Sequence, residues 1–148
     1  MNIKTGSTLL ITGLAFMLVT TNAVGANQYP IVKTMSQFEL DGKLDEPAWQ
    51  QATKIDLSYN INPGLSTPSP VKTTAYIYET NTALMIGFVA EDPEPNKIRA
   101  YYRDRDTIFQ DDFVGIVIDT FNDNRRAYEF FVNPYGVQGD LIKDDTQG

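Results

Sequence analysis

The segment Arg99–Asp106, with the sequence RAYYRDRD, holds a dense group of side chains suited to binding a ligand. Tyr101 and Tyr102 offer flat aromatic faces, and Arg103 and Asp104 follow directly with charged hydrogen-bonding groups. Aromatic rings cover apolar surface while tolerating a polar rim, and charged partners make the stronger hydrogen bonds. The segment is therefore a candidate binding loop. The alternative is a solvated edge strand whose ion pairs each contribute only about 0–1 kcal/mol.

Catalytic chemistry is restricted because the chain contains no Cys and no His. This excludes thiolate nucleophiles, disulfides, Cys/His zinc sites and Ser-His-Asp relays. The chain has 19 Asp and Glu residues, but glycoside hydrolysis needs two carboxylates about 5 Å or about 6.5–9.5 Å apart. Asp111 and Asp112 adjoin a predicted strand, where neighbouring side chains point to opposite faces. We therefore expect no intrinsic enzymatic activity.

Four aspartates are candidate metal ligands. Asp41 and Asp45 flank a turn at Gly42, and the same reasoning extends to Asp92 and Asp112 beside predicted strands. Ca²⁺ prefers several oxygen ligands at short range. Structural calcium is therefore a candidate cofactor, although such residues more often serve as turn and helix-cap acids.

Short β-strands are the elements that must position these groups. Six segments alternate apolar and polar residues or are rich in β-branched and aromatic ones. They are Ile55–Ile61, Val71–Glu79, Leu84–Ala90, Phe113–Asp119, Arg126–Asn133 and Val137–Lys143. Leu84–Ala90 and Phe113–Asp119 are apolar enough to be buried strands. Short strands with turns between them predict an all-β fold, an antiparallel β-sandwich or barrel.

One short helix is expected among these strands. Asp45–Thr53 has a candidate N-cap in its first residue and Pro47 in its first turn. This helix would place Trp49, the only Trp of the chain, as a plug between the two sheets. Pro63–Pro70 contains three Pro and one Gly and is predicted to be a loop. The predicted turns between the last three strands are Asn122–Asn124 and Asn133–Gly136.

Residues 1–26 have the pattern of a secretory signal peptide. Lys4 precedes the apolar run Thr8–Thr20, and small residues follow as far as Ala26. The run is shorter than the roughly 20 residues of a comfortable membrane span. We therefore expect cleavage and export, with a retained N-terminal anchor as the alternative. Residues 27–148 would form one domain.

The last predicted strand is followed only by Asp144–Gly148. An unpaired last strand would leave an open sheet edge, which natural proteins usually cover. We therefore expect this chain to be the front part of a longer protein. The alternative is a natural C-terminus with a frayed tail.

The charge balance bears on the choice of partner. The chain has 12 Lys and Arg against 19 Asp and Glu, a net charge of −7. An acidic chain is repelled by phosphate backbones, so nucleic acid is not an expected partner.

Three blocks of the sequence resemble the family 9 carbohydrate-binding modules and their relatives. They are Leu40–Trp49 (LDGKLDEPAW), Leu84–Pro93 (LMIGFVAEDP) and Asp111–Asp119 (DDFVGIVID). The order and spacing of the blocks fit the family over roughly residues 37–140. Asp119–Asp123 and Tyr128–Gly136 look closer still to a branch in which the module opens long exported bacterial proteins. The resemblance implies an immunoglobulin-like or jelly-roll β-sandwich lacking its last strands, and a link to polysaccharide catabolism.

The resemblance also implies sugar contacts. One stacking tryptophan of the family corresponds to Phe109, and a polar family position corresponds to Asn133. The sequence departs from the family where its Glu and Arg are replaced by Gly115 and Phe131. The second stacking tryptophan would lie beyond Gly148. Members of the family bind structural calcium, which agrees with the carboxylate prediction above.

Three hypotheses follow. The first is a non-catalytic module in the bacterial periplasm, in the outer membrane or at the cell surface, binding a glycan or oligosaccharide by ring stacking and hydrogen bonds. Its candidate contacts are Phe109, Tyr101, Tyr102, Arg103, Asp104 and Asn133. The second is a structural domain that docks onto the C-terminal remainder of a larger outer-membrane or periplasmic chain and has lost sugar binding. The third, part of a glycoside hydrolase, requires two carboxylates facing each other across a cleft. An exposed Phe109 beside a groove favours the first hypothesis, and a buried Phe109 favours the second.

Overall fold

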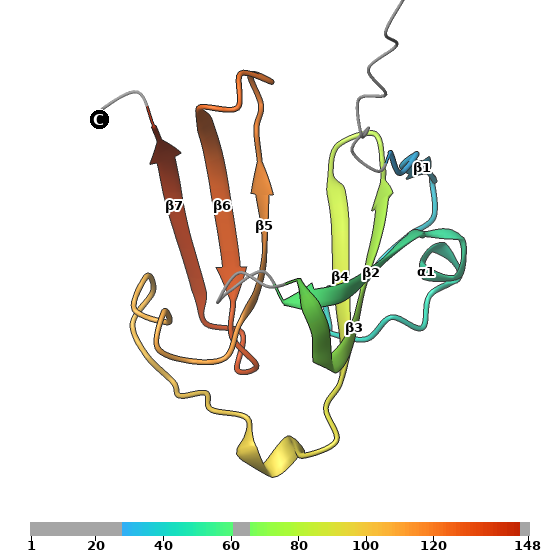
Figure 1. Cartoon of the computed structure of the whole chain (residues 1–148). Coiled ribbons are helices and arrows are strands. Elements are labelled where there is room, and N and C mark those ends of the chain that lie inside the picture. The colour runs from blue at the N-terminus through green and yellow to red at the C-terminus, as the bar shows by residue number, and fades with distance from the viewer. Residues whose placement is uncertain (1–27, 61–65, 146–148) are drawn as a thin grey trace, which may run out of the picture.

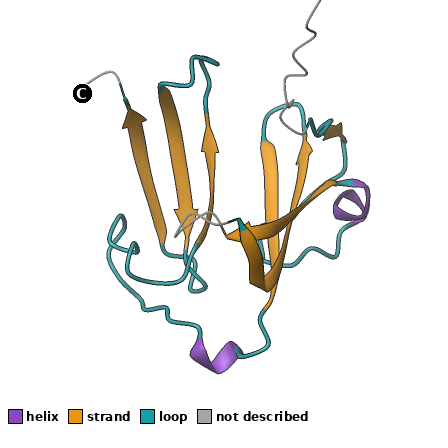
Figure 2. Cartoon of the chain, viewed as in Figure 1, coloured by secondary structure: helices purple, strands orange, loops and turns teal. Residues whose placement is uncertain are grey.

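A computed structural model describes residues 28–60 and 66–145, which form two β-sheets and almost no helix (Figures 1 and 2). The predicted all-β class is therefore confirmed. The predicted signal peptide and the final residues 146–148 lie outside the described residues. Within the described ranges, no helix is long and apolar enough to cross a membrane.

The first sheet is built around one long central strand. Its members are β1 (Val32–Lys33), β2 (Thr53–Asn60), β3 (Thr67–Glu79) and β4 (Leu84–Glu91). β3 pairs antiparallel with β2 and with β4, and its last residues pair in parallel with β1. Thr80 and Ala83 close the β3–β4 hairpin through a backbone hydrogen bond of 2.8 Å. The predicted strands in this half of the chain are thus present.

The second sheet consists of the last three strands in chain order. They are β5 (Val114–Ile118), β6 (Arg126–Val132) and β7 (Gln138–Asp144), paired antiparallel. Both predicted turns are present. The β5–β6 turn places Asn122 and Asn124 at φ values of 52° and 55°, which asparagine tolerates better than most residues. Gly136 has φ +78° in the β6–β7 turn, where a side chain would be strained.

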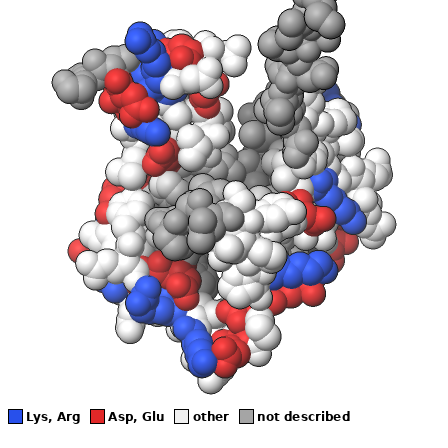
Figure 3. All heavy atoms as spheres, viewed as in Figure 1, with Lys and Arg blue, Asp and Glu red and all other residues white. Residues whose placement is uncertain are grey.

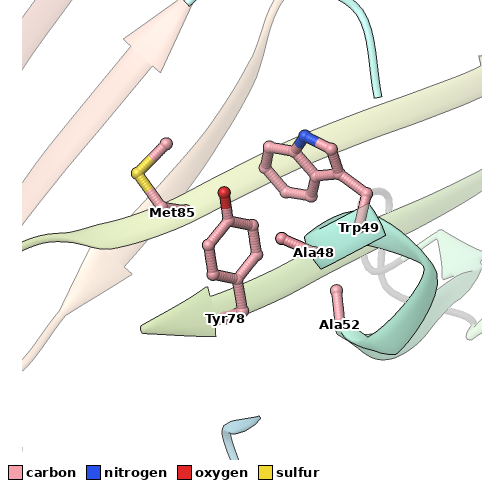
Figure 4. Close-up of a cluster of buried hydrophobic side chains, with 5 residues drawn as sticks. All are labelled: Ala48, Trp49, Ala52, Tyr78 and Met85. Atoms are coloured by element: carbon pink, nitrogen blue, oxygen red, sulfur yellow. The ribbon is translucent and has the colours of Figure 1, made fainter. Parts of the chain in front are cut away.

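The main hydrophobic core lies on the side of the first sheet that faces α1 (Pro47–Gln51). Its buried members are Ala48, Trp49, Ala52, Tyr78 and Met85 (Figure 4). The indole of Trp49 meets the ring of Tyr78 edge-on, with centroids 4.7 Å apart. Such edge-to-face pairs contribute about 0.5–1.5 kcal/mol beyond area burial. This cluster fastens the helix to the sheet.

Trp49 is buried as predicted, but it does not lie between the sheets. Side chains alternate across a strand, so Tyr78 and Met85 face away from their neighbours Ile77 and Ile86. Ile86 lines a hollow toward the second sheet, which puts Trp49 on the opposite face. Figure 1 shows α1 on the far side of the first sheet from β5–β7. The prediction of an inter-sheet plug was therefore wrong.

A cleft separates the two sheets. It contains two hollows of about 670 Å³ and 580 Å³, and both are lined by Phe88 of β4, Val114 of β5 and Val132 of β6. No strand of the first sheet makes extensive contact with a strand of the second. Phe130, which also lines the cleft, remains 47% exposed. The described residues therefore leave apolar surface open between the sheets.

A long segment between β4 and β5 connects the sheets and contains η1 (Pro95–Lys97) (Figure 2). It reaches the free edge of β7, where the Asp106 N–H donates to the carbonyl of Gln138 at 3.0 Å. The Asp140 N–H in turn donates to a carboxylate oxygen of Asp106 at 3.0 Å. Ile108, fully buried, lies against Gly139 of β7. The segment therefore covers part of the β7 edge and is fixed to the second sheet.

Local predictions needed four corrections. The helix covers only Pro47–Gln51, and its N-cap is Glu46 in place of Asp45. β3 begins at Thr67, inside the predicted loop Pro63–Pro70, whose first residues lie outside the described ranges. The segments expected to be buried strands, β4 and β5, are only partly buried. Their cleft-lining residues Phe88 and Val114 are half-buried, while Val89 and Val117, which line neither hollow of the cleft, are exposed. Arg99–Asp106 forms no strand, so its edge-strand alternative is wrong.

Candidate functional site

Asp111 lies just after the predicted binding loop Arg99–Asp106 and anchors it, although the sequence singled it out only as half of an acidic pair. Its carboxylate accepts hydrogen bonds from the Tyr101 N–H at 3.2 Å and from the Arg103 Nε at 3.0 and 3.2 Å. A third donor is the Asn133 Nδ2, at 3.0 Å. The side chain of Asp111 is fully buried, while that of Arg103 remains about a third exposed. A buried charge is tolerated only when it is paired and hydrogen-bonded, and this one is both.

The electrostatics of Asp111 reflect two opposing effects. Burial by itself raises the pKa of a carboxyl group, because it disfavours the charged form. The hydrogen bonds from Asn133, from the Tyr101 N–H and from Arg103, with the charge of Arg103, together outweigh burial and lower the pKa of Asp111. The carboxylate therefore stays ionised and holds the loop.

Asn133 connects this loop to the β6–β7 turn. Its Nδ2 donates to the carbonyl of Tyr101 at 2.9 Å as well as to Asp111. Its Oδ1 accepts the N–H groups of Tyr135 and Val137, each at 3.0 Å. The residue is 3% exposed, and these four bonds occupy its amide. Asn133 was predicted to bind a ligand hydroxyl, but it is placed here to position two loops.

Three exposed aromatic rings belong to residues close to the buried side chains of Asp111 and Asn133. Tyr101 and Tyr102 are 54% and 81% exposed, and Tyr135 is 51% exposed. The guanidinium carbon of Arg103 lies 5.0 Å from the ring centroid of Tyr101, within cation–π range. Tyr102 and Tyr135 have ring centroids 4.5 Å apart and planes tilted by 30°. The predicted tyrosines and Arg103 are thus brought together with Tyr135.

Tyr135 was missed by the sequence prediction. It lies in the turn Asn133–Gly136, which was read only as a junction between strands. An aromatic residue inside a turn was the one available signal, because turns lie on the surface and often carry binding residues. The Tyr135 ring contacts Tyr102, a residue far away in the sequence, so the sequence alone does not show this contact.

Phe109 is neither fully exposed nor buried. It is 41% exposed and packs edge-on against Phe113 and Phe131, with centroids 6.1 and 5.8 Å away. Gly115 and Phe131 are register partners, and a Cβ on Gly115 would come within 2.5 Å of the Phe130 carbonyl oxygen and would collide with the Phe131 ring. Gly115 and Phe131 therefore fit each other, because the Phe131 ring lies where Gly115 has no side chain.

The remaining charged groups of the loop lie at its surface. Asp104 is exposed, and its carbonyl accepts a hydrogen bond from the Thr107 hydroxyl at 2.7 Å. Arg105 pairs with Asp140 and donates to the Gln138 side chain. In Figure 3, positive and negative side chains lie next to one another along this face. Asp104 therefore remains a candidate hydrogen-bond acceptor.

The four candidate metal ligands do not converge. Asp41 and Asp45 border one hollow, whereas Asp92 and Asp112 border the inter-sheet cleft. Asp41 is occupied by the side chain and backbone N–H of Lys43, which lower its pKa. In the described part of the chain, no group of three or more acidic side chains is arranged to hold a metal ion. These four residues therefore do not fit one calcium site, and calcium binding stays a prediction.

Comparisons with known protein families, with curated proteins and with solved structures found no match to this chain. Function must therefore be judged from the geometry of the chain itself. The clearest feature is the group of exposed rings held by Asp111 and Asn133, which we call the tyrosine site: Tyr101, Tyr102, Arg103, Asp104 and Tyr135.

Proposed function

We propose that this chain is an exported, non-catalytic carbohydrate-binding domain that recognises a glycan through the tyrosine site. Within this proposal the two sheets are halves of a β-sandwich of immunoglobulin-like or jelly-roll type. Signal-peptide export would bring the domain to the periplasm, the outer membrane or the cell surface of a bacterium. The residues that contact the sugar are surface groups of one loop and one turn.

The observation that carries this proposal is the rigid presentation of exposed aromatic rings. Exposed Tyr side chains lose little conformational entropy on binding when their backbone is already fixed. Here the backbone at Tyr101 and at Tyr135 is hydrogen-bonded to the buried Asp111–Asn133 pair. Arg103 and Asp104 supply a charged donor and an acceptor beside the rings, as hydroxyl groups require. Phe109 contributes chiefly to packing against Phe113 and Phe131.

Affinity electrophoresis of the complete chain through gels containing soluble polysaccharides, together with a glycan array, tests this proposal. We expect retardation by at least one polysaccharide. Asp111→Asn removes the charged carboxylate that holds the loop, so this variant should be retarded less than the wild type. It serves as the matched loss-of-function control. Runs with and without Ca²⁺ test the cofactor prediction separately. Absence of retention on every glycan under both conditions would contradict carbohydrate binding.

A second candidate function is docking to the C-terminal remainder of a larger chain. The open cleft favours it, because apolar side chains of both sheets, including Phe88, Phe130 and Val132, face a common space without filling it. Large exposed apolar surface typically marks an interaction site. Dye binding by 1-anilinonaphthalene-8-sulfonate measures this surface. The docking function predicts strong dye fluorescence from the folded chain, which a Phe130→Ser variant reduces, whereas fluorescence at the level of an ordinary folded protein would contradict it.

A further inference from the structure

The tyrosine site contains two different kinds of aromatic contact. Tyr101 is covered on one side by the Arg103 guanidinium, whereas Tyr102 and Tyr135 lie against each other. Tyr102 nevertheless remains 81% exposed. No hydrogen bond holds either phenolic hydroxyl of this pair within the described residues. The pair thus presents open aromatic surface and two free hydroxyl groups.

The spacing of the pair decides how a ligand can use it. Van der Waals contact requires about 3.5–4.0 Å on each side of an inserted group, so a sugar ring between two aromatic rings needs a separation of roughly 7–8 Å. The centroids of Tyr102 and Tyr135 are only 4.5 Å apart. A pyranose cannot enter between them and must stack on an outer face.

The two rings also differ in how firmly they are attached. The Tyr135 N–H donates to Asn133, whose own backbone carbonyl accepts the Gly136 N–H at 2.9 Å. The turn is therefore closed on both sides of Tyr135. Tyr102 projects further into solvent and rests against that fixed ring. The more exposed ring has a rigid support behind it.

The geometry points to Tyr102 as the platform on which the flat C–H face of a pyranose stacks, with Tyr135 as the positioning residue that orients it. This assignment rests on the proposed carbohydrate function and adds which ring meets the sugar. The ligand is therefore a cyclic sugar with an apolar ring face, and an open-chain polyol should not bind. Phe109 takes no part in the contact.

The test uses the full chain with selectively ¹³C-labelled tyrosine rings, titrated by NMR with cellohexaose, maltohexaose and mannitol. The two hexasaccharides present pyranose faces in different linkages, and mannitol presents hydroxyls without a ring. We expect at least one hexasaccharide, and not mannitol, to shift the Tyr102 ring signals. Tyr102→Ala should weaken binding by about tenfold or more, while Tyr102→Phe, which keeps the ring, should change it by less than about threefold. Tyr59→Ala removes a comparably exposed tyrosine from β2 and should leave affinity unchanged.

The positioning role of Tyr135 has its own readout. Tyr135→Ala should shift the Tyr102 ring signals in the ligand-free protein and weaken hexasaccharide binding by about threefold or more, whereas Tyr135→Phe should do neither. Unchanged Tyr102 signals in Tyr135→Ala would overturn the supporting role.

Two outcomes separate the inference from the proposed function. Hexasaccharide binding that leaves the Tyr102 signals unmoved at saturation, or that survives Tyr102→Ala, would overturn the Tyr102 platform while carbohydrate binding stands. Failure of the wild-type chain to bind either hexasaccharide or any glycan of the array would overturn both. Because the NMR shifts are measured on the wild-type chain, the inference remains testable if Tyr102→Ala does not fold.

Discussion

Replacing Asn133 by Ala should destabilise the second sheet and weaken glycan binding together. The substitution removes four hydrogen bonds of 2.9–3.0 Å: those to the Tyr101 carbonyl and Asp111, and those from the Tyr135 and Val137 N–H groups. A net hydrogen bond contributes about 0.5–1.5 kcal/mol to stability. Tyr135 and Val137 lie near enough to the surface for water to replace part of the loss. We therefore expect the free energy of unfolding to fall by about 2–4 kcal/mol.

Urea unfolding measures this loss with two probes. Far-UV circular dichroism follows both sheets, while the fluorescence of Trp49 follows only the core beside α1. Asn96→Ala is the matched control, because Asn96 is exposed in η1 and its side chain makes no hydrogen bond within the described residues. Because contacts between the sheets are sparse, the dichroism transition should move further than the fluorescence transition.

The reasoning about Asn133 would be refuted by a loss below about 0.5 kcal/mol, the usual range of a surface substitution. It would be refuted equally if Asn133→Ala and Asn96→Ala changed stability to the same extent. If Asn133→Ala is destabilised but binds glycan as tightly as the wild type, Asn133 stabilises the fold without positioning the tyrosine site. That result would contradict the positioning role.

Three further predictions concern the scaffold. Gly115→Ala should cost about 1–3 kcal/mol in urea unfolding, because the added Cβ meets the Phe130 carbonyl and the Phe131 ring; a neutral effect would contradict this packing. The N–H groups of Asn124 and its neighbours lower the pKa of Asp119, so its stabilising effect is complete above about pH 4 and is lost on acidification. Asp119→Asn should flatten the fall in stability between about pH 5 and about pH 2, and an unchanged slope would refute it. The Tyr78 hydroxyl is buried without a hydrogen-bond partner among the described residues, and burial followed by the charge of Glu46 raises the pKa of Tyr78. Tyr78→Phe should leave stability within about 0.5 kcal/mol of wild type or increase it, and should reduce alkaline destabilisation above about pH 10, in urea unfolding at both pH values.

Local pattern predicted the strands well. The alternation in Val71–Glu79 correctly indicated β3, and the asparagine and glycine turns correctly marked the ends of β5, β6 and β7. These features depend on residues close in sequence, whose backbone preferences and side-chain periodicity act locally. The start of β3 at Thr67 was missed because Pro is unfavourable within a strand. Here neither proline pairs with β4, since Pro68 pairs with Tyr59 of β2 and Pro70 lies at the register irregularity of the β2–β3 pairing.

The candidate site was predicted in part. Tyr101, Tyr102 and Arg103 were recognised because rings and charges follow one another along the chain. Asp111 and Tyr135 were not assigned to the site, because their importance comes from hydrogen bonds and ring contacts across 8 to 33 positions of sequence. Asn133 was predicted as a sugar contact, and the sequence did not reveal that its amide bonds to two loops, because sequence does not show whether an amide faces solvent or another segment.

The sequence by itself determined an all-β chain with a candidate export signal, an acidic charge and no thiol or imidazole chemistry. Residue types and short-range periodicity suffice for those conclusions. Only the tertiary structure decided that Trp49 packs outside the inter-sheet space, that the acidic candidates lie apart, and that the Tyr135 ring lies against Tyr102. Each of these depends on which face of a strand or loop turns toward a distant segment. That choice is made by packing and by the need to satisfy buried polar groups over the whole fold.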